Sequence, residues 1–146
     1  MNKKPFEKFV ISQAALLFRD DKCLILEAAP NTTYAGKAGF PGGRIDEGEA
    51  GKDEEAFRRE INEELGLVVF DTMGIVDFDT WYTETGVPRA AVVRYIKNKT
   101  DEIVLSDEHS KYMWITENEI DHYTYAWKNA PRMLQKGFEF HRKLKK

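Results

Sequence analysis

The fold is decided by residues 43–67, which read GRIDEGEAGKDEEAFRREINEELGL. Within this stretch, residues 53–65 predict a helix, because acidic side chains crowd its first turn, where the positive end of the helix dipole favours them. Asp53 is the predicted N-cap, and Gly66 is the predicted stop. This helix is the clearest element of the chain, and the other expectations are built around it.

One face of the predicted helix carries three glutamates. An advance of about 100° per residue places Glu60, Glu63 and Glu64 in a single stripe. Like charges three and four residues apart destabilise a helix, and the one basic neighbour, Arg59, has the weaker orientation. A solvated face with ion pairs is the alternative interpretation, but crowded carboxylates favour a divalent cation such as Mg²⁺ as counter-charge. The adjoining apolar stripe, which would face the core, consists of Phe57, Ile61 and Leu65.

The residues before the helix predict a glycine-pinned loop. Gly42 and Gly43 begin it, and further acids follow before the helix. Glycines let backbone carbonyl and amide groups approach a ligand closely. A phosphate-binding P-loop around Gly51 and Lys52 is excluded, since Asp53 replaces the Ser or Thr that this motif needs.

The same stretch resembles the signature of the Nudix hydrolase family, which reads Gly, five residues, Glu, seven residues, then Arg-Glu-aliphatic-x-Glu-Glu-x-Gly-aliphatic. Gly43 and Glu49 match the first part, and residues 59–67 match the second without a mismatch. There are two departures. Nine residues rather than seven separate Glu49 from Arg59, which predicts a longer loop before the helix. Ala38 stands where many relatives have tryptophan.

This resemblance implies a single domain over residues 1–146, with a Nudix-type α/β/α sandwich around a mixed β-sheet. It also implies hydrolysis, by metal-activated water, of the pyrophosphate linkage in a nucleoside diphosphate derivative, with Mg²⁺ or Mn²⁺ as cofactor. Candidate substrates include a nucleoside triphosphate, a nucleotide sugar and ADP-ribose. The chemistry of the residues agrees with this function. Carboxylates alone would repel a pyrophosphate, whereas divalent ions bound to them turn this repulsion into attraction.

The resemblance also assigns roles by position. Arg59 is expected to orient a glutamate of the signature, such as Glu49, rather than to bind phosphate. The general base stays open between Glu60 and Glu108, an acid on a later loop whose alternative role is that of a solvated surface residue. The implied metal ligands are Glu60, Glu63, Glu64 and the carbonyl of Gly43.

Aromatic residues are weaker candidates, for stacking on a nucleobase. Trp81 and Tyr82 follow the signature by about fifteen residues, where some members of the family place a selectivity residue, and Phe40 lies on the entry loop. Buried aromatic side chains are the commoner alternative. His109, a lone loop histidine, is expected to be a surface residue.

Short apolar runs bounded by polar turns predict strands outside the helix. Thr116 and Glu119 form a predicted capping box at a helical turn. The glycine-rich residues 30–43 predict a loop, and residues 125–144 predict a C-terminal helix with Pro131 near its start. The predicted strands cover residues 9–18, 23–29, 67–78, 90–96 and 112–115.

Composition limits the other functions. The chain has 146 residues and a formal charge of −3, and it holds no apolar run long enough to span a membrane. Without a chain-wide basic character, nucleic acid is an unexpected partner. Cys23 is the single cysteine, which excludes an internal disulfide and fits a reducing, cytoplasmic setting.

Three alternatives to a small-molecule pyrophosphohydrolase stay open. A non-catalytic nucleotide-sensing domain could use the same fold, although every glutamate of the signature is present. An RNA 5′-end pyrophosphohydrolase would need a basic channel and would show salt-sensitive RNA binding. A metal-dependent isomerase is a further possibility on this fold. The expected partner is a nucleotide substrate, and the resemblance adds a homodimer as a common state of relatives.

Overall fold

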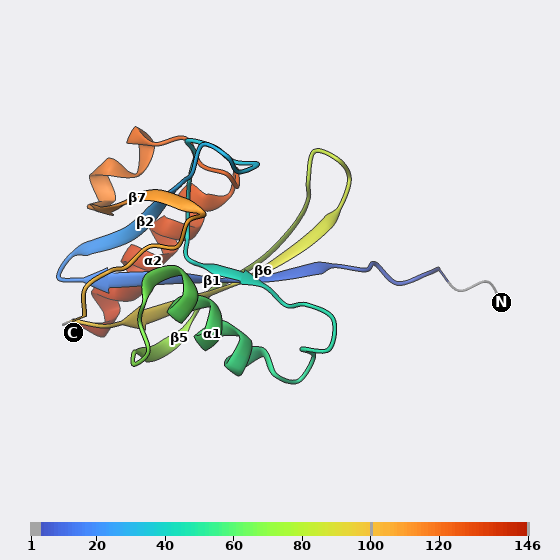
Figure 1. The fold of residues 1–146 in the computed structure, drawn as a ribbon, viewed down its shortest axis with the longest axis horizontal. Helices are drawn as coiled ribbons and strands as arrows, with labels where there is room; N and C mark the ends of the chain where they lie inside the picture. Colours follow the sequence, from blue (N-terminus) through green and yellow to red (C-terminus); the bar gives the residue numbers. More distant parts are fainter. Residues whose placement is uncertain (1–3, 100, 146) are drawn as a thin grey trace.

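A mixed seven-stranded sheet organises the chain in the computed structural model, which describes residues 4–99 and 101–145 (Figure 1). The main path of the sheet has the order β3-β2-β1-β6-β5; β4 pairs with β1, and β7 pairs with β2. β1 and β6 run parallel, and the other pairs are antiparallel. The strands are β1 (Val10–Arg19), β2 (Lys22–Ala28), β3 (Ala38–Gly39), β4 (Gly42–Arg44), β5 (Asp71–Tyr82), β6 (Pro88–Lys97) and β7 (His109–Ile115).

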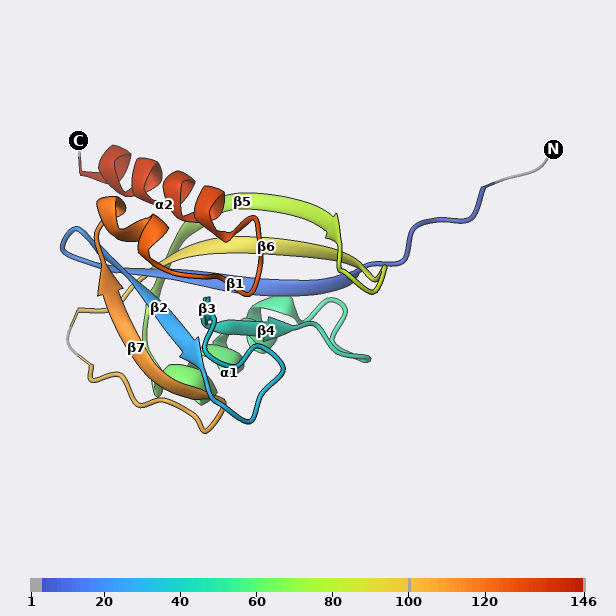
Figure 2. The ribbon, with the colours of Figure 1, turned by 90° about the horizontal axis from the view of Figure 1, so that it is seen from above.

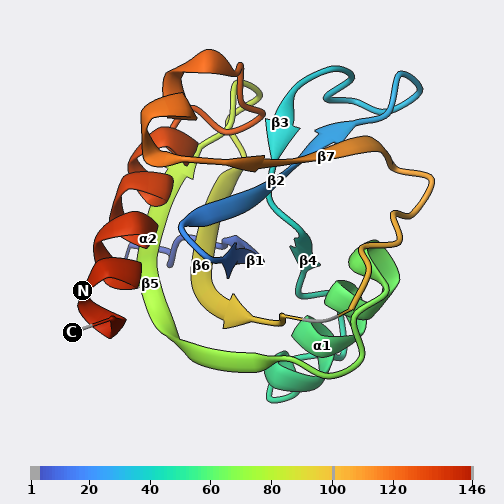
Figure 3. The same ribbon diagram turned by 90° about the vertical axis from the view of Figure 1, so that its left-hand side faces the viewer.

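Two α-helices cover opposite faces of this sheet, α1 (Asp53–Leu65) on one and α2 (Ala130–Leu144) on the other (Figures 2 and 3). β1 contributes side chains to the apolar clusters on both faces of the sheet, because successive side chains of a strand point to opposite faces. Leu16 and Phe18 pack in the cluster under α2, whereas Leu17 packs in the cluster under α1. The predicted α/β class and sandwich with a mixed sheet are therefore confirmed. Among the described residues, no helix is both long and apolar enough to cross a bilayer.

The bounds of α1 agree with the helix predicted from the sequence, but its N-cap does not. Lys52 occupies the N-cap and Asp53 is the first helical residue, without a side-chain capping hydrogen bond, so the prediction for Asp53 is wrong. The stop is confirmed: Gly66 has φ +71°, and its N–H donates to the Asn62 carbonyl at 2.8 Å. The predicted apolar stripe of this helix is fully buried.

Several other bounds shift for reasons of tertiary packing. β5 begins at Asp71 rather than at Leu67, because Leu67 and Phe70 are buried against α1 before the strand starts. The predicted loop over residues 30–43 contains β3 and the start of β4. α2 begins at Ala130 rather than at residue 125, since the preceding segment pairs with β3.

A short 3₁₀ helix, η1 (Glu117–His122), leads into that segment. The predicted capping box is present: the Glu119 carboxylate accepts hydrogen bonds from the Thr116 N–H and hydroxyl, both at 2.9 Å. After η1 the chain bonds to β3, because Ala38 N–H donates to the Thr124 carbonyl and Ala126 N–H donates to the Ala38 carbonyl. These contacts fix the position of residues 124–127, which form part of the site described below.

Thr116→Ala is expected to lower the free energy of unfolding by about 1 kcal/mol, because it removes the hydroxyl that bonds Glu119 at the cap. Urea denaturation followed by circular dichroism measures this change. Thr124→Ala is the matched control, since the Thr124 side chain is exposed. Equal stabilities of the two variants would contradict a stabilising role of the capping box.

Candidate active site

The acidic helix contacts the sheet at two glycines of β4. Gly42 and Gly43 pair with Ala14 and Gln13 of β1. The Gly42 N–H donates to the Glu64 carboxylate at 2.8 Å. A Cβ added at Gly43 would lie 2.5 Å from Oε2 of Glu60, so only glycine leaves room for this carboxylate. The backbone of β4 and two glutamates of α1 therefore form one compact set of oxygen and N–H groups.

Burial changes the ionisation of these two glutamates. Glu64 is only 8% exposed. Desolvation raises its pKa from 4.5 to about 8; the Gly42 N–H opposes this rise, and the charges of Glu60, Glu108 and Glu63 add to it. Desolvation also raises the pKa of Glu60, and the Arg59 guanidinium opposes that rise. The fold thus holds two carboxyl groups in a place that disfavours their negative charge.

Arg59 supplies part of the missing counter-charge. Its guanidinium lies 3.2 Å from the Glu49 carboxylate, 3.1 Å from Glu60 and 3.7 Å from Glu63. The Glu49 charge is the largest cause of the raised pKa of Arg59. One guanidinium faces these three carboxylates, and it leaves Glu64 without a positive partner among the ion pairs of the described residues. The structure therefore places Arg59 against signature glutamates, including Glu49.

The donors present fit a hard divalent cation. Carboxylate and backbone oxygens are the ligands that Mg²⁺ and Mn²⁺ prefer. Glu60 and Glu64 both face the β4 backbone. Their pKa values are raised, and a bound cation would lower them again. In the described part of the chain, no three acidic, histidine or cysteine side chains already form a metal-binding group. Glu63, whose side chain is 58% exposed, would have to turn away from Arg59 to join them.

The longer loop before α1 folds into turns and leaves Glu49 in place. The Asp46 N–H donates to the Glu49 carboxylate at 2.8 Å, and the Lys52 N–H donates to the Glu49 carbonyl at 2.9 Å. Gly48 and Gly51 adopt positive φ angles of 86° and 83° in these turns. The two extra residues are thus absorbed ahead of the helix, and Glu49 still reaches Arg59.

A cleft of about 220 Å³ begins at Gly42 and Gly43, and we call it the first cleft. It lies between β1, β4 and the segment after η1. None of the described residues that line it is acidic, whereas three are basic. Its polar and aromatic wall consists of Ser12, Gln13, Tyr34, Lys37, Phe40, Arg44, Arg89, His109 and Trp127.

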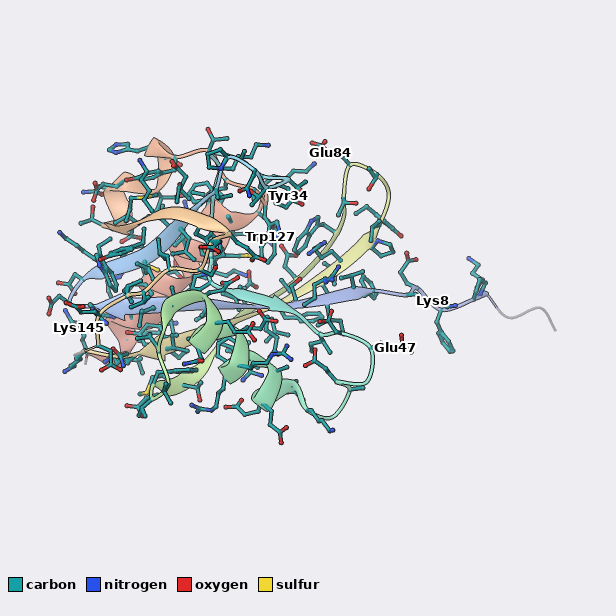
Figure 4. All side chains as sticks on the ribbon, in the orientation of Figure 1. Lys8, Tyr34, Glu47, Glu84, Trp127 and Lys145 are labelled. Carbon is teal, nitrogen blue, oxygen red and sulfur yellow. The ribbon has the colours of Figure 1, made fainter. Side chains whose placement is uncertain are left out.

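A second cleft of about 300 Å³ adjoins the first and shares Tyr34, Lys37, Arg89, Ala126 and Trp127 with it. It lies beneath the β5–β6 turn, whose tip carries Glu84, with Tyr34 and Trp127 close by (Figure 4). The other residues lining it are Thr33, Trp81, Tyr82, Thr83, Glu84, Thr85 and Lys128.

The residues that are weaker candidates in the sequence lie in or near these two clefts. Phe40 lines the first cleft, whereas Trp81 and Tyr82 line only the second. Glu108 is exposed on the loop before β7, close enough for its charge to raise the pKa of Glu64. The expectation that His109 is a surface residue is wrong: it is half-buried in the wall of the first cleft, and burial lowers its pKa.

Sequence reasoning missed Lys37, Arg89 and Trp127 as site residues. Arg89 stands at the start of β6, where its Nη1 donates to the Ser12 hydroxyl at 3.1 Å. Trp127 packs against both Phe40 and Trp81, with ring centroids 6.4 and 5.2 Å apart. No motif marks these positions, and only the tertiary fold brings the three distant segments that carry them together.

Comparison with known proteins gives one family and many similar structures. A family model described as NUDIX domain matches residues 8–136. The MutT protein from Methanosarcina mazei Go1 is 26% identical, with a TM-score of 0.75, over 98% of this chain and 100% of that chain. The E. coli ORF135 protein is 21% identical, with a TM-score of 0.76, over 94% and 96% of the two chains. A C. elegans Ap4A hydrolase is 19% identical, with a TM-score of 0.75, over 92% and 98%. No curated protein matches the chain significantly.

Proposed function

Because this chain belongs to the NUDIX domain family, we propose that it is a pyrophosphohydrolase that cleaves a nucleoside diphosphate derivative with the help of Mg²⁺ or Mn²⁺. One observation carries this proposal: the acidic residues of α1 meet, at Gly42 and Gly43, a cleft lined by aromatic and basic side chains. An anhydride held at the glycines would have its phosphates beside the carboxylates and its nucleoside in the first cleft. The similarity to a MutT protein at 26% identity supports the same class.

The residues that would hold the cation are Glu60, Glu63, Glu64 and the carbonyl of Gly43. When bound, the cation would neutralise phosphate oxygens and activate the attacking water. Arg59 acts as a positioning residue, because its contacts with Glu49 and Glu60 fix the orientation of those side chains. Phe40 and Trp127 offer apolar surface for the nucleoside part of the substrate.

We assign the general base to Glu108 rather than to Glu60. Glu60 is already engaged, because its carboxylate lies against Gly43 and accepts a hydrogen bond from Arg59 at 3.1 Å. Glu108 is exposed and close to Glu64, and its backbone carbonyl accepts a hydrogen bond from Ala29 at 2.9 Å, which anchors this part of the loop. Its carboxylate is thus able to take a proton from water beside the acidic residues.

A substrate panel tests the proposed function. Nucleoside triphosphates, ADP-ribose, nucleotide sugars and dinucleoside polyphosphates are incubated with Mg²⁺, and released phosphate and pyrophosphate are measured. We expect hydrolysis of at least one substrate and its loss when EDTA removes the metal. Binding of these nucleotides without turnover of any of them would contradict the proposal and favour a sensor.

Glu108→Gln and Glu60→Gln separate the two candidate bases. Glu108→Gln is expected to lower kcat by about a hundredfold, with the Mg²⁺ concentration needed for half-activation unchanged, because only proton transfer is lost. Glu60→Gln is expected to raise that Mg²⁺ concentration as well as to lower kcat. If Glu108→Gln has the same kcat as the unmodified chain, the assignment of Glu108 is contradicted and Glu60 is favoured as the base.

A further inference from the structure

A cavity of about 530 Å³ lies far from the two clefts, and we call it the distal cavity. β1 contributes Gln13 to the first cleft and Arg19 to the distal cavity, and these positions are about 20 Å apart along the extended strand. In Figure 4, Lys145 of the distal cavity lies on the side of the molecule opposite Glu47 and Glu84. The ends of β1, β6 and α2 form its walls, through Phe18, Arg19, Asp20, Asp21, Lys97, Lys99, His141 and Lys145.

The described walls of the distal cavity carry more positive than negative charge. Four of the lining side chains are cationic, whereas two are carboxylates. Lys97 stands opposite Phe18 in the β1–β6 pair, so both side chains point to the face that α2 covers. Lys97 and Lys99 take part in none of the ion pairs between described residues, although Lys145 pairs with Asp21. Cations gathered without counter-charges repel one another, so this cavity favours a bound anion.

Arg19 is a third cation whose partners in the described part of the chain are neutral. Its guanidinium donates to the Asn98 backbone carbonyl at 2.7 Å and to the Asn98 side-chain oxygen at 3.0 Å. It also lies over the Trp114 ring, 5.1 Å from the centroid. These partners hold the guanidinium in place and leave its charge uncompensated. An anion that binds to a fixed cation loses less free energy to the ordering of side chains.

Asp21 shows that the cavity already holds an oxygen anion. One oxygen of its carboxylate, Oδ1, accepts hydrogen bonds from Nε2 of His141, at 3.0 Å, and from Nζ of Lys145. These hydrogen bonds lower the pKa of Asp21. His141 is 5% exposed, and its Nδ1 lies 2.6 Å from the Tyr95 hydroxyl, which fixes the imidazole. The Asp21 side chain is 72% exposed, so it is able to turn outward and leave these two donors to a ligand oxygen.

The described lining residues offer no surface on which a nucleobase could stack. Only Phe18 and His141 have aromatic rings there, and they are 2% and 5% exposed. The two rings stack on each other, with centroids 4.6 Å apart. Tyr34 and Trp127, by contrast, line both clefts of the proposed active site. The volume of the distal cavity is within the ~300–1,000 Å³ that is typical of small-molecule sites, so it favours a compact anion without a base.

We propose that the distal cavity binds a condensed inorganic phosphate, a short linear anion such as pyrophosphate or tripolyphosphate. Linked phosphate groups carry several negative charges along one chain, and they match cations that are spread over three walls. A single orthophosphate would reach fewer of these cations. Two sources share this chemistry: pyrophosphate released by anhydride hydrolysis, and free polyphosphate. This binding is independent of the pyrophosphohydrolase function proposed above.

Isothermal titration calorimetry of the chain in EDTA, at low salt, tests this binding. The ligands are orthophosphate, pyrophosphate, tripolyphosphate and ATP. We expect tripolyphosphate to bind about tenfold tighter than orthophosphate or more, because it makes more charge-assisted contacts. ATP is expected to bind no tighter than tripolyphosphate, because its base has nothing to stack on. Equal affinities for pyrophosphate and tripolyphosphate would assign the cavity to pyrophosphate, and a preference for tripolyphosphate would assign it to longer chains.

Two variants are expected to change the affinity for tripolyphosphate in opposite directions. The Lys97→Ala, Lys99→Ala double variant is expected to weaken binding by roughly tenfold or more, because it removes two cationic donors. Asp21→Asn is expected to strengthen binding by about threefold, because it removes the carboxylate that competes for the same donors. Its amide oxygen can still accept the hydrogen bond from His141. Circular dichroism checks that both variants are folded, and Lys99→Ala alone, at an exposed position, replaces the double variant if that does not fold.

Two lysine variants are the matched controls, and both are expected to leave the affinity unchanged. Lys143→Ala removes an exposed lysine of α2 outside the cavity, and Lys37→Ala removes a lysine that lines both clefts.

Four results would overturn the proposal: no binding of tripolyphosphate, an unchanged affinity in the lysine variants of the cavity, no gain in Asp21→Asn, or ATP binding about tenfold tighter than tripolyphosphate. Loss of binding in Lys37→Ala would also overturn it, because the anion would then lie in the clefts. No hydrolysis is measured in this assay. A failure here therefore leaves the proposed pyrophosphohydrolase function standing, and an inactive chain that binds tripolyphosphate in this way leaves the distal site standing.

Discussion

Glu64→Gln is expected to lower kcat by at least about a thousandfold, because it removes a charged oxygen ligand from the proposed cation site. Steady-state hydrolysis at saturating Mg²⁺ measures this loss. The protein is expected to stay folded, since the amide oxygen of glutamine can still accept the Gly42 hydrogen bond that Glu64 accepts at 2.8 Å. Near-normal activity would contradict the assignment of Glu64 as a metal ligand.

The same substitution is expected to stabilise the metal-free protein at alkaline pH. Burial raises the pKa of Glu64 to about 8, so the folded protein binds a proton that the unfolded chain releases near pH 4.5. Stability from this group is therefore complete at acid pH and falls as the pH rises from about 4.5 to about 8. Glutamine has no such dependence. Its advantage over glutamate at pH 9 is expected to be about 2 kcal/mol or more.

Urea denaturation in EDTA, at pH 5 and pH 9, measures this difference. Glu55→Gln is the control, because Glu55 is an exposed glutamate of the same helix. Its stability relative to the unmodified chain is expected to change little between the two pH values. A Glu64→Gln variant that is equally destabilised at both pH values would contradict the burial of an unpaired carboxyl group at this position.

Gly42→Ala is expected to lower the free energy of unfolding by about 3 kcal/mol or more. The residue has φ +142°, a conformation that side chains rarely adopt, and an added Cβ would overlap the Gln13 carbonyl of β1. Relief of this overlap requires β4 to move away from β1, which would displace the Gly42 N–H from Glu64. Activity is therefore expected to be lost together with stability.

Gly48→Ala is the matched control for this prediction. Gly48 also has a positive φ, of 86°, but nothing lies within 4 Å of an added Cβ. Its cost is expected to be about 1 kcal/mol, from backbone strain alone. Thermal and urea unfolding of the two variants give the comparison. Equal losses would mean that backbone strain, rather than the close approach of β4 to β1, sets the requirement for glycine at residue 42.

Signals between residues close together in the sequence explain the predictions that the structure confirms. The helix over residues 53–65 is specified by charges in its first turn, a periodic apolar stripe and a glycine stop, all within one segment. The acidic stripe follows from the same geometry. The N-cap prediction is wrong because aspartate is favoured both at the cap and in the first turn, and Asp53 occupies the first turn.

Long-range pairing explains what the sequence could not predict. β3 and β4 contain too few residues for a periodic pattern, and they are strands only because β2 and β1 pair with them. The clefts combine residues 33–40, 81–89 and 126–128, which lie far apart in the chain. The prediction of a surface position for His109 is wrong because the pairing of this residue, at the start of β7, with the end of β2 cannot be inferred from neighbouring residues.

We propose above that Glu60, Glu63, Glu64 and the carbonyl of Gly43 hold a divalent cation. Anomalous diffraction from a crystal soaked in Mn²⁺ tests it most directly, because it locates the ion without assuming any activity. The claim predicts a strong anomalous peak between α1 and β4, within coordination distance of the Glu60 and Glu64 carboxylates. A fully soaked crystal with no peak there, and with Glu60 and Glu64 still turned toward the β4 backbone, would contradict it.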